Sequence, residues 1–273
     1  MSSIGEIRSV TGEGGALRVH IRRAVHGSGV PLVVANGIGA SIELLQPFVD
    51  ALPADIEVVR FDVPGAGGSP QRSWPYRLPG LARLLRRALD DLGYDRVDML
   101  GVSWGGGLAQ QFAVTRGGRC RRLILVSTGT GALMLPGSPR VLRLMTTPRR
   151  YRDPKYAQRI AGTIYGGAMR AEPERAARLL GQEANRVVSS TGYWMQMLAV
   201  AGWTSLPWLW RIRQPTLILA GDDDPIVPLI NARIMATMIP NARLHVYHDG
   251  HLALVTDAAT LAPLIIDFLN EHG

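Results

Sequence analysis

A serine in a glycine-rich turn is the first feature of this chain that could do chemistry. Residues 101–105 read Gly-Val-Ser-Trp-Gly, which fits G-x-S-x-G, and they follow an apolar β-type run and precede a helical one. In that context a sharp strand-to-helix turn pushes the side chain of Ser103 clear of the backbone, and the small flanking residues leave room for it. The helix N-terminus aims backbone N–H groups at the same point. We therefore predict that Ser103 is a nucleophile.

A serine hydroxyl needs a base to become nucleophilic, and His251 is the predicted base. It follows Asp249 and Gly250 just after the last predicted strand, where a loop can carry it back over the edge of a sheet. The remaining histidines lie in or beside predicted strands or at predicted surface positions: His20, His26, His245, His248 and His272.

Three consecutive aspartates, residues 222–224, offer an acid to orient this histidine. Asp224 fits G-x-x-D-x-x-x-P, so we predict that it holds His251 and stabilises the imidazolium. A calcium or magnesium site would need more oxygen ligands at suitable spacing, so no metal is expected. The chain order serine, aspartate, histidine is that of the α/β-hydrolase fold and differs from the orders in chymotrypsin and subtilisin.

The oxyanion that forms during acyl transfer needs preorganised N–H donors. One predicted donor is the backbone N–H of Trp104, directly after the nucleophile. The other is the N–H of Ile38, in the run Asn-Gly-Ile-Gly at residues 36–39 after an early strand. Most α/β-hydrolases carry His-Gly here, but a backbone donor does not depend on the side chain of Asn36. Asn36 and Gly37 are also predicted to contact the substrate.

Short apolar runs alternate with helical patterns, as is needed to bring these residues to one edge of a sheet. Buried strands are predicted over residues 31–36, 56–61, 97–102, 123–126, 215–220 and 244–247, and antiparallel lead-in strands over 4–10 and 16–25. Leucines at spacings of three and four predict a helix that Gly93 ends. Further helices are predicted over residues 104–115 and 258–270. This alternation predicts a parallel sheet covered by helices on both faces.

Residues 132–212 interrupt that alternation and are predicted to form a helical insert. They hold four of the six tryptophans, five of the nine methionines and repeated prolines. Some of these apolar residues form plain core, whereas others are predicted to wall an apolar substrate pocket. Trp194 and Trp203 are the predicted substrate contacts. The predicted core domain is then made of residues 1–131 and 213–273.

The insert also carries the whole excess of positive charge. It has 12 basic and 4 acidic residues, while the rest of the chain has 18 of each. Either this is a solvated, arginine-rich surface, or it meets something anionic such as lipid headgroups or an acidic partner. Nucleic acid is not expected as a partner, because no helix-turn-helix, zinc-finger or RNP-type pattern accompanies the charge. The glycines at 65–68 do not fit a dinucleotide-binding motif.

The composition of the chain indicates the compartment in which the protein is expected. No run of about 18 apolar residues exists, so no transmembrane segment is expected. The first ten residues lack an apolar signal region, and the single cysteine, Cys120, excludes an intrachain disulfide framework. A reducing cytoplasm is therefore the expected location.

Taken together, these residues resemble the intracellular medium-chain-length polyhydroxyalkanoate depolymerases, which are α/β-hydrolases. The matching stretches are residues 36–40, 61–65, 101–106, 109–112, 148–151, 163–167, 202–205, 221–225 and 249–252. The resemblance implies a mostly parallel, eight-stranded sheet flanked by helices, with a lid-like cap over residues 132–212. It implies a serine esterase for polyesters of 3-hydroxy fatty acids, with Ser103, Asp224 and His251 as its triad, and association with storage granules.

Two other functions stay open at this point. One is a general carboxylesterase or lipase for smaller hydrophobic esters. The other is a hydrolase-fold ligand receptor without catalysis, since some such receptors keep a complete triad. No cofactor is required by any of these functions, and no oligomeric state is predicted.

Overall fold

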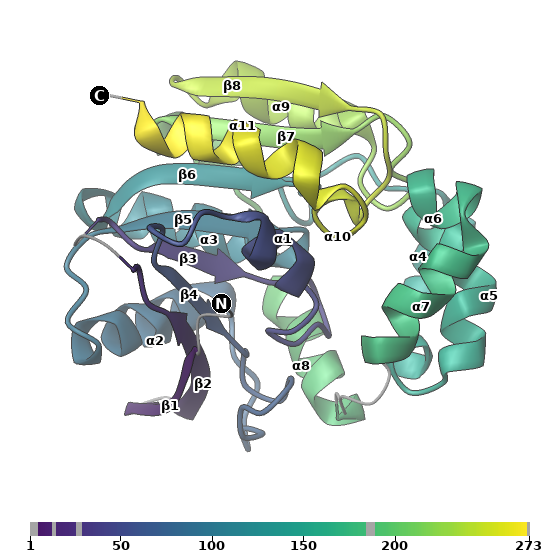
Figure 1. Cartoon of the computed structure of the whole chain (residues 1–273), viewed down its shortest axis with the longest axis horizontal. Coiled ribbons are helices and arrows are strands. Elements are labelled where there is room, and N and C mark those ends of the chain that lie inside the picture. Colours follow the sequence, from purple (N-terminus) through teal and green to yellow (C-terminus); the bar gives the residue numbers. More distant parts are fainter. Residues whose placement is uncertain (1–4, 13–14, 26–28, 184–188, 272–273) are drawn as a thin grey trace.

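One sheet of eight strands organises the computed structural model, which describes residues 5–12, 15–25, 29–183 and 189–271 (Figure 1). The strands lie in the order β1-β2-β4-β3-β5-β6-β7-β8. Their bounds are β1 (Glu6–Gly12), β2 (Gly15–Arg22), β3 (Leu32–Ala35), β4 (Val58–Phe61), β5 (Val97–Val102), β6 (Cys120–Val126), β7 (Thr216–Gly221) and β8 (Ala242–Tyr247).

The strands from β4 to β8 in this order pair in parallel, whereas β1 and β2 join them as an antiparallel pair. The predicted mostly parallel, eight-stranded sheet is therefore confirmed. Successive side chains of a strand point to opposite faces. In β3, Val33 and Ala35 join one apolar cluster while Leu32 and Val34 join the other. Burial on both faces explains why the parallel strands read as continuous apolar runs.

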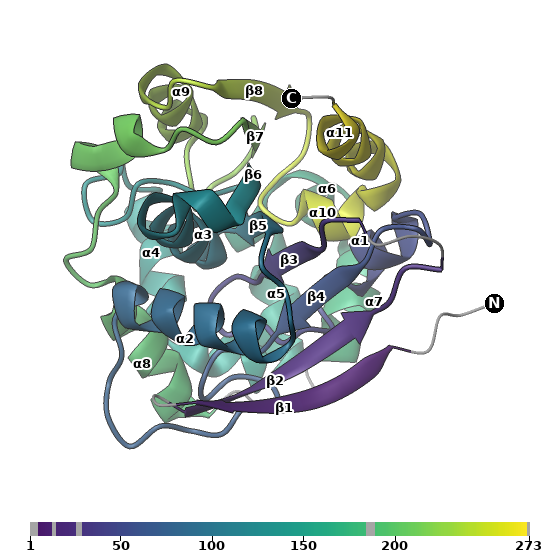
Figure 2. The ribbon, with the colours of Figure 1, turned by 90° about the vertical axis from the view of Figure 1, so that its left-hand side faces the viewer.

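Helices cover both faces of the sheet (Figure 2). On one face lie α2 (Leu78–Asp91), α3 (Trp104–Thr115) and α9 (Leu229–Met238), and on the other lie α1 (Gln46–Ala51), α10 (Ala253–Thr256) and α11 (Ala258–Asn270). Helices α3 and α11 have the bounds that their sequence pattern predicts. Helix α2 ends before Gly93, whose φ of 79° is a left-handed conformation that glycine adopts without a steric penalty.

Between β6 and β7 the chain forms helices. They are α4 (Pro139–Met145), the 3₁₀ helix η2 (Pro148–Tyr151), α5 (Pro154–Tyr165), α6 (Gly167–Ala171), α7 (Pro173–Glu183), α8 (Ser190–Val200) and the 3₁₀ helix η3 (Leu206–Arg211). Prolines begin several of them, because a proline at the first helical position costs no backbone hydrogen bond. Helices α4 to α7 lie beyond the carboxyl ends of the parallel strands (Figure 1).

The helices of this insert share their buried surface with the sheet. Ile160 and Ile164 of α5 belong to the cluster that contains α1 and α11. Tyr193 and Ala199 of α8 belong to the cluster that contains α2 and α3. The division into a core (1–131 and 213–273) and a cap (132–212) stays a prediction. Among the described residues, no helix is long and apolar enough to cross a membrane.

Candidate active site

Ser103 occupies the sharp turn between β5 and α3. Its φ of 53° and ψ of −119° lie outside the usual regions for a residue with a Cβ atom, which is a strained conformation. A Cβ atom on Gly101 would come within 2.5 Å of the carbonyl oxygen of Gly105. A Cβ atom on Gly105 would come within 2.2 Å of the carbonyl oxygen of Ala35. Glycine at both positions therefore lets the turn close tightly around the serine.

Neighbouring backbone groups hold this strained turn in place. The N–H of Ser103 donates to the carbonyl of Val126 in β6 at 2.9 Å. The carbonyl of Ser103 accepts from the hydroxyl of Thr128 at 2.6 Å and from the N–H of Gly106 at 2.9 Å. The serine side chain thus sits on a rigid support at the carboxyl edge of the sheet.

The structure brings Asp224 and His251 together. Oδ2 of Asp224 lies 2.7 Å from Nδ1 of His251, and both side chains are almost fully buried. The other carboxylate oxygen of Asp224 accepts the N–H groups of Ile226 and Val227 at 2.9 and 3.0 Å. These bonds fix the position of the carboxylate. Because Nδ1 of His251 is occupied by Asp224, Nε2 is the ring nitrogen available for proton transfer.

The adjacent aspartates have other partners. Asp222 contacts Nδ1 of His248 at 2.5 Å, and the His248 side chain is 95% exposed. Asp223 pairs with Arg170 at 3.0 Å and accepts the N–H of Gly167 at 2.7 Å, both from the insert. Only the third aspartate of the run thus meets the predicted base.

Two other described histidines, His20 and His245, lie on strands β2 and β8. His20 contacts Arg60 on the neighbouring strand at 3.1 Å, and His245 is exposed on β8. His26 and His272 lie outside the described residues.

The loop at residues 36–39 reaches Ser103, as the oxyanion-hole prediction requires. A Cβ atom on Gly37 would lie only 3.6 Å from Cβ of Ser103. Within the described part of the chain, the backbone N–H groups of Ile38 and Trp104 have no hydrogen-bond acceptor. Two free N–H donors next to a serine can stabilise a developing oxyanion.

Residues of the insert hold this loop in position. The hydroxyl of Tyr151 donates to the carbonyl of Ile38. The side-chain oxygen of Gln196 accepts the N–H of Gly39 at 2.8 Å, and its backbone carbonyl accepts the indole N–H of Trp104 at 2.9 Å. Both predicted oxyanion donors are therefore linked to the insert.

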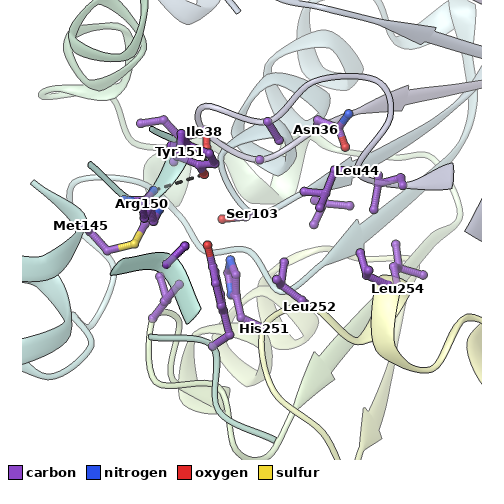
Figure 3. A pocket seen from close by; sticks show the side chains of 18 of the residues that line it. Asn36, Ile38, Leu44, Ser103, Met145, Arg150, Tyr151, His251, Leu252 and Leu254 are labelled. Atoms are coloured by element: carbon purple, nitrogen blue, oxygen red, sulfur yellow. Dashed lines mark hydrogen bonds between the residues drawn. The ribbon is translucent and has the colours of Figure 1, made fainter. Parts of the chain in front are cut away.

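An apolar pocket opens at Ser103 and His251 (Figure 3). The core contributes mainly aliphatic side chains, and Asn36 and Gly37 also line it. The insert contributes Met145, Arg150, Tyr151, Ala157, Ile160 and Tyr165. The amide nitrogen of Asn36 donates to the carbonyl of Ser41 at 2.8 Å.

Trp194 and Trp203 do not line this pocket. Trp194 is 49% exposed on α8, where it packs edge-on against Tyr193. The ring of Trp203 packs against Gly131 and Gly107, and its indole N–H donates to the side chain of Gln111 at 2.9 Å. A Cβ atom on Gly131 would come within 2.6 Å of this ring, so the indole can pack there only because residue 131 is a glycine. The insert wall of the pocket thus consists of other side chains than the two predicted ones.

Arg150, Tyr151 and Tyr165 were not among the predicted site residues. They lie in the stretches 148–151 and 163–167, whose only sequence signal was the family resemblance. The carbonyl of Tyr165 accepts the N–H of His251 at 2.8 Å, and its ring stacks on the imidazole with centroids 6.5 Å apart. Burial raises the pKa of the Tyr165 phenol, which therefore stays neutral at pH 7.

No group of three or more His, Cys, Asp or Glu side chains that could hold a metal ion occurs among the described residues.

The fold and this site define the class of the protein. A family model for the alpha/beta hydrolase fold matches residues 30–258. The chain therefore belongs to the α/β-hydrolase fold family. Among solved structures, the enol-lactonase from Burkholderia xenovorans has a TM-score of 0.82 and 23% identity, covering 97% of this chain and all of that one. That likeness concerns the fold alone.

Proteins of similar sequence indicate which kind of hydrolase the chain resembles. A poly(3-hydroxyalkanoate) depolymerase from Ectopseudomonas oleovorans is 54% identical over 244 residues, which cover 89% of this chain and 85% of that protein. The resemblance inferred from the sequence is therefore confirmed. A 2-hydroxy-6-oxononadienedioate/2-hydroxy-6-oxononatrienedioate hydrolase from Cupriavidus pinatubonensis is 29% identical, covering 99% of this chain and 98% of that protein.

Proposed function

We propose that this protein is a serine esterase that hydrolyses the ester bonds of medium-chain-length poly(3-hydroxyalkanoates) and their oligomers. The observation that carries the proposal is that Ser103, Ile38 and His251 line one apolar pocket, where the imidazole of His251 contacts the buried carboxylate of Asp224. The 54% identity to a poly(3-hydroxyalkanoate) depolymerase supports the polyester as the substrate.

The reaction follows from the geometry of the site. Oγ of Ser103 attacks the ester carbonyl while Nε2 of His251 takes its proton, and Asp224 stabilises the imidazolium. The N–H groups of Ile38 and Trp104 hold the oxyanion. His251 then protonates the departing hydroxyl, which leaves an acyl-enzyme. A water molecule activated by His251 attacks the acyl-enzyme and releases the acid.

The apolar wall of the pocket supports the proposal that the substrate carries side chains of medium length. Leu44, Ile160, Leu252 and Leu254 line the pocket with other aliphatic residues. Burial of a methylene group is worth about 0.8 kcal/mol, so each added methylene raises kcat/KM up to about fourfold until the pocket is full.

The helices of residues 132–212 act as a lid over this pocket. Their contacts with Ile38, Gly39 and His251 support this role, because they join the lid to the predicted catalytic groups. The net charge of +8 in the insert supports adsorption to storage granules coated with anionic lipid or protein in the cytoplasm.

Product analysis tests the proposal. The protein is incubated with a polyester of 3-hydroxyoctanoate and with one of 3-hydroxybutyrate, and the released acids are identified. We expect release from the long-side-chain polymer, and a preference for octanoyl over acetyl nitrophenyl esters. A preference for acetyl esters would indicate a general esterase, and a lack of turnover on every ester would indicate a receptor.

The nucleophile is tested in the same assays. Ser103→Ala should lower kcat by about 10⁴- to 10⁶-fold without unfolding the protein. An organophosphonate should label Ser103 in the wild type, as mass spectrometry of the digested protein would show. Labelling of another serine, or full activity of the alanine variant, would overturn the assignment.

A further inference from the structure

A buried arginine lies on the wall of the catalytic pocket. Arg150, in η2, is only 5% exposed and lines the same pocket as Ser103 and His251. Figure 3 shows it beside Tyr151, on the side of the pocket that the insert forms. The mechanism described above gives this cation no role.

The guanidinium of Arg150 has no counter-ion in the described part of the chain. Within the described residues, no carboxylate lies at ion-pair distance from its guanidinium. Nη1 donates to the carbonyl of Thr147 at 3.4 Å and Nη2 to the hydroxyl of Tyr151 at 3.3 Å, both of which are long bonds. Nε is buried and has no acceptor in the described structure. Burying a cation without an anion is energetically unfavourable.

Among the described residues, Arg22, Arg60 and Arg122 are also buried, lack a carboxylate partner at ion-pair distance and have an Nε without an acceptor. Arg150 differs from them in the length of its hydrogen bonds and in its position on the pocket wall. Arg22, for example, donates to four backbone carbonyls at 2.5 to 3.2 Å.

Arg149, the preceding residue, is exposed, pairs with Asp153 at 3.1 Å and stacks on Tyr156. Arg150 instead meets only neutral groups, namely the carbonyl of Thr147 and the phenols of Tyr151, Tyr165 and Tyr193, and it lines the pocket that a substrate would fill.

Tyrosine rings account for only part of this environment. The guanidinium lies 4.5 Å from the ring centroid of Tyr151 and 5.3 Å from that of Tyr193. Such cation–π contacts favour a positive charge, and the side chains of Tyr165 and Tyr193 also hydrogen-bond to Arg150, but none of these neutral groups is a counter-ion. Burial raises the pKa of the neighbouring Tyr165 phenol, so this phenol supplies no anion at pH 7. The site therefore lacks one anion that can accept several hydrogen bonds.

We propose that Arg150 binds the free carboxylate at the end of a hydroxyalkanoate chain, so that the enzyme removes units from the carboxyl end. This inference rests on the proposed esterase function. A linear polyester of this kind has one hydroxyl end and one carboxylate end. A planar guanidinium is suited to a carboxylate because its N–H donors match the two oxygens.

The reaction at the chain end balances as follows. Ser103 attacks the carbonyl of the penultimate unit, and the bond from this carbonyl to the oxygen of the last unit breaks. That oxygen takes the proton from His251, and the last unit leaves as a 3-hydroxyalkanoate with its carboxylate on Arg150. Water then hydrolyses the acyl-enzyme, which frees Ser103 and creates a new carboxylate end on the shortened chain.

The test uses two dimers of 3-hydroxyoctanoate, one with a free carboxylate and one with that carboxylate methylated. The measured quantity is the ratio of kcat/KM for the acid to kcat/KM for the methyl ester. We expect the wild type to favour the acid and the ratio to fall about 10- to 10³-fold in Arg150→Gln, as is typical when one partner of a buried charge pair is removed. Arg150→Lys, which keeps the charge, should retain part of the preference.

Arg149→Gln is the matched control, since it removes the same charge one residue earlier from an exposed position. It should keep the wild-type ratio, and thermal melts should show that all variants fold. Equal rates on both dimers in the wild type would overturn the inference without any variant. Equal losses on both dimers in Arg150→Gln would assign Arg150 to the structure of the lid alone.

Two further outcomes distinguish binding of the chain end from binding of the product and from a failure of the proposed function. Inhibition by free 3-hydroxyoctanoate that depends on Arg150, without a preference for the acid dimer, would place the product there and overturn the chain-end assignment. Failure to cleave either dimer, together with turnover of nitrophenyl octanoate, would overturn the proposed polyester function and this inference with it.

Discussion

At the scale of single residues, three neighbouring aspartates have different chemical environments because their carboxylates point to different partners. Asp224 contacts the buried imidazole of His251, whereas Asp222 contacts the exposed His248 and Asp223 pairs with Arg170. An orienting acid fixes the tautomer of the base and stabilises its charged form, so that removing it typically costs about 10⁴ in kcat.

We therefore expect Asp224→Asn to lower kcat for nitrophenyl octanoate about 10⁴-fold. Asp222→Asn and Asp223→Asn remove the same charge from adjacent positions and should each cost less than about tenfold, because neither carboxylate contacts His251. Steady-state kinetics on the three variants checks this. Similar losses in all three would contradict the assignment of the acid.

At the scale of elements, the 3₁₀ helix η2 of the insert contacts the loop at residues 36–39. The hydroxyl of Tyr151 donates to the carbonyl of Ile38, and the N–H of Ile38 is a predicted oxyanion donor. A hydrogen bond of this kind is worth about 1 kcal/mol. Tyr151→Phe should therefore lower kcat for a neutral nitrophenyl ester roughly three- to tenfold, with a smaller change in KM, because the loss falls on the transition state.

Tyr156→Phe is the control for this experiment. It removes a hydroxyl from α5, where the ring of Tyr156 stacks with Arg149 and does not line the pocket. Its kinetics should match those of the wild type. A change in KM alone for Tyr151→Phe would indicate that the hydroxyl acts in substrate binding rather than in positioning the loop.

A histidine in the pairing of β2 with β4 is expected to make the free energy of unfolding depend on pH. His20 lies opposite Arg60 in this antiparallel pair. Burial, together with the guanidinium groups of Arg60 and Arg18, lowers the pKa of His20 below 6.5. Below about pH 6.5 the unfolded chain therefore binds a proton that the folded chain resists, and the free energy of unfolding falls as the pH falls.

We expect His20→Asn to flatten this dependence between about pH 7 and pH 5 in urea unfolding experiments. His245→Asn, at an exposed position on β8, should leave the slope as in the wild type. An unchanged slope in His20→Asn would show that other groups cause the dependence.

At the scale of the whole molecule, the excess positive charge is concentrated in one segment of the chain. The insert carries 12 basic and 4 acidic residues, while the two flanking segments together are neutral. The buried pair Asp224–His251 is shielded from salt, whereas exposed charges are screened over about 10 Å at 0.1 M ionic strength.

Hydrolysis of granules coated with anionic lipid should therefore slow as salt rises from low to high concentration, while turnover of a soluble octanoyl ester should change little. Both rates are measured in the same salt series, and uncoated polymer serves as the control surface. Equal salt responses of granules and soluble ester would rule out electrostatic adsorption by the insert.

The sequence by itself determined the parts of this protein that depend on local chemistry. A tight strand-to-helix turn requires glycine at positions 101 and 105, and strands buried on both faces require continuous apolar runs. These local requirements are visible in the order of the residues, and they predicted the sheet, the place of Ser103 and the bounds of α3 and α11.

Only the tertiary structure decided which side chains of the insert face the pocket. Tryptophan content indicated Trp194 and Trp203, but the pocket wall contains Met145, Tyr151 and Tyr165 instead. The orientation of each short helix depends on contacts between residues far apart in the chain, which no local pattern encodes. The environment of Arg150 could not be predicted for the same reason. Whether its side chain has a counter-ion depends on all the elements that surround it.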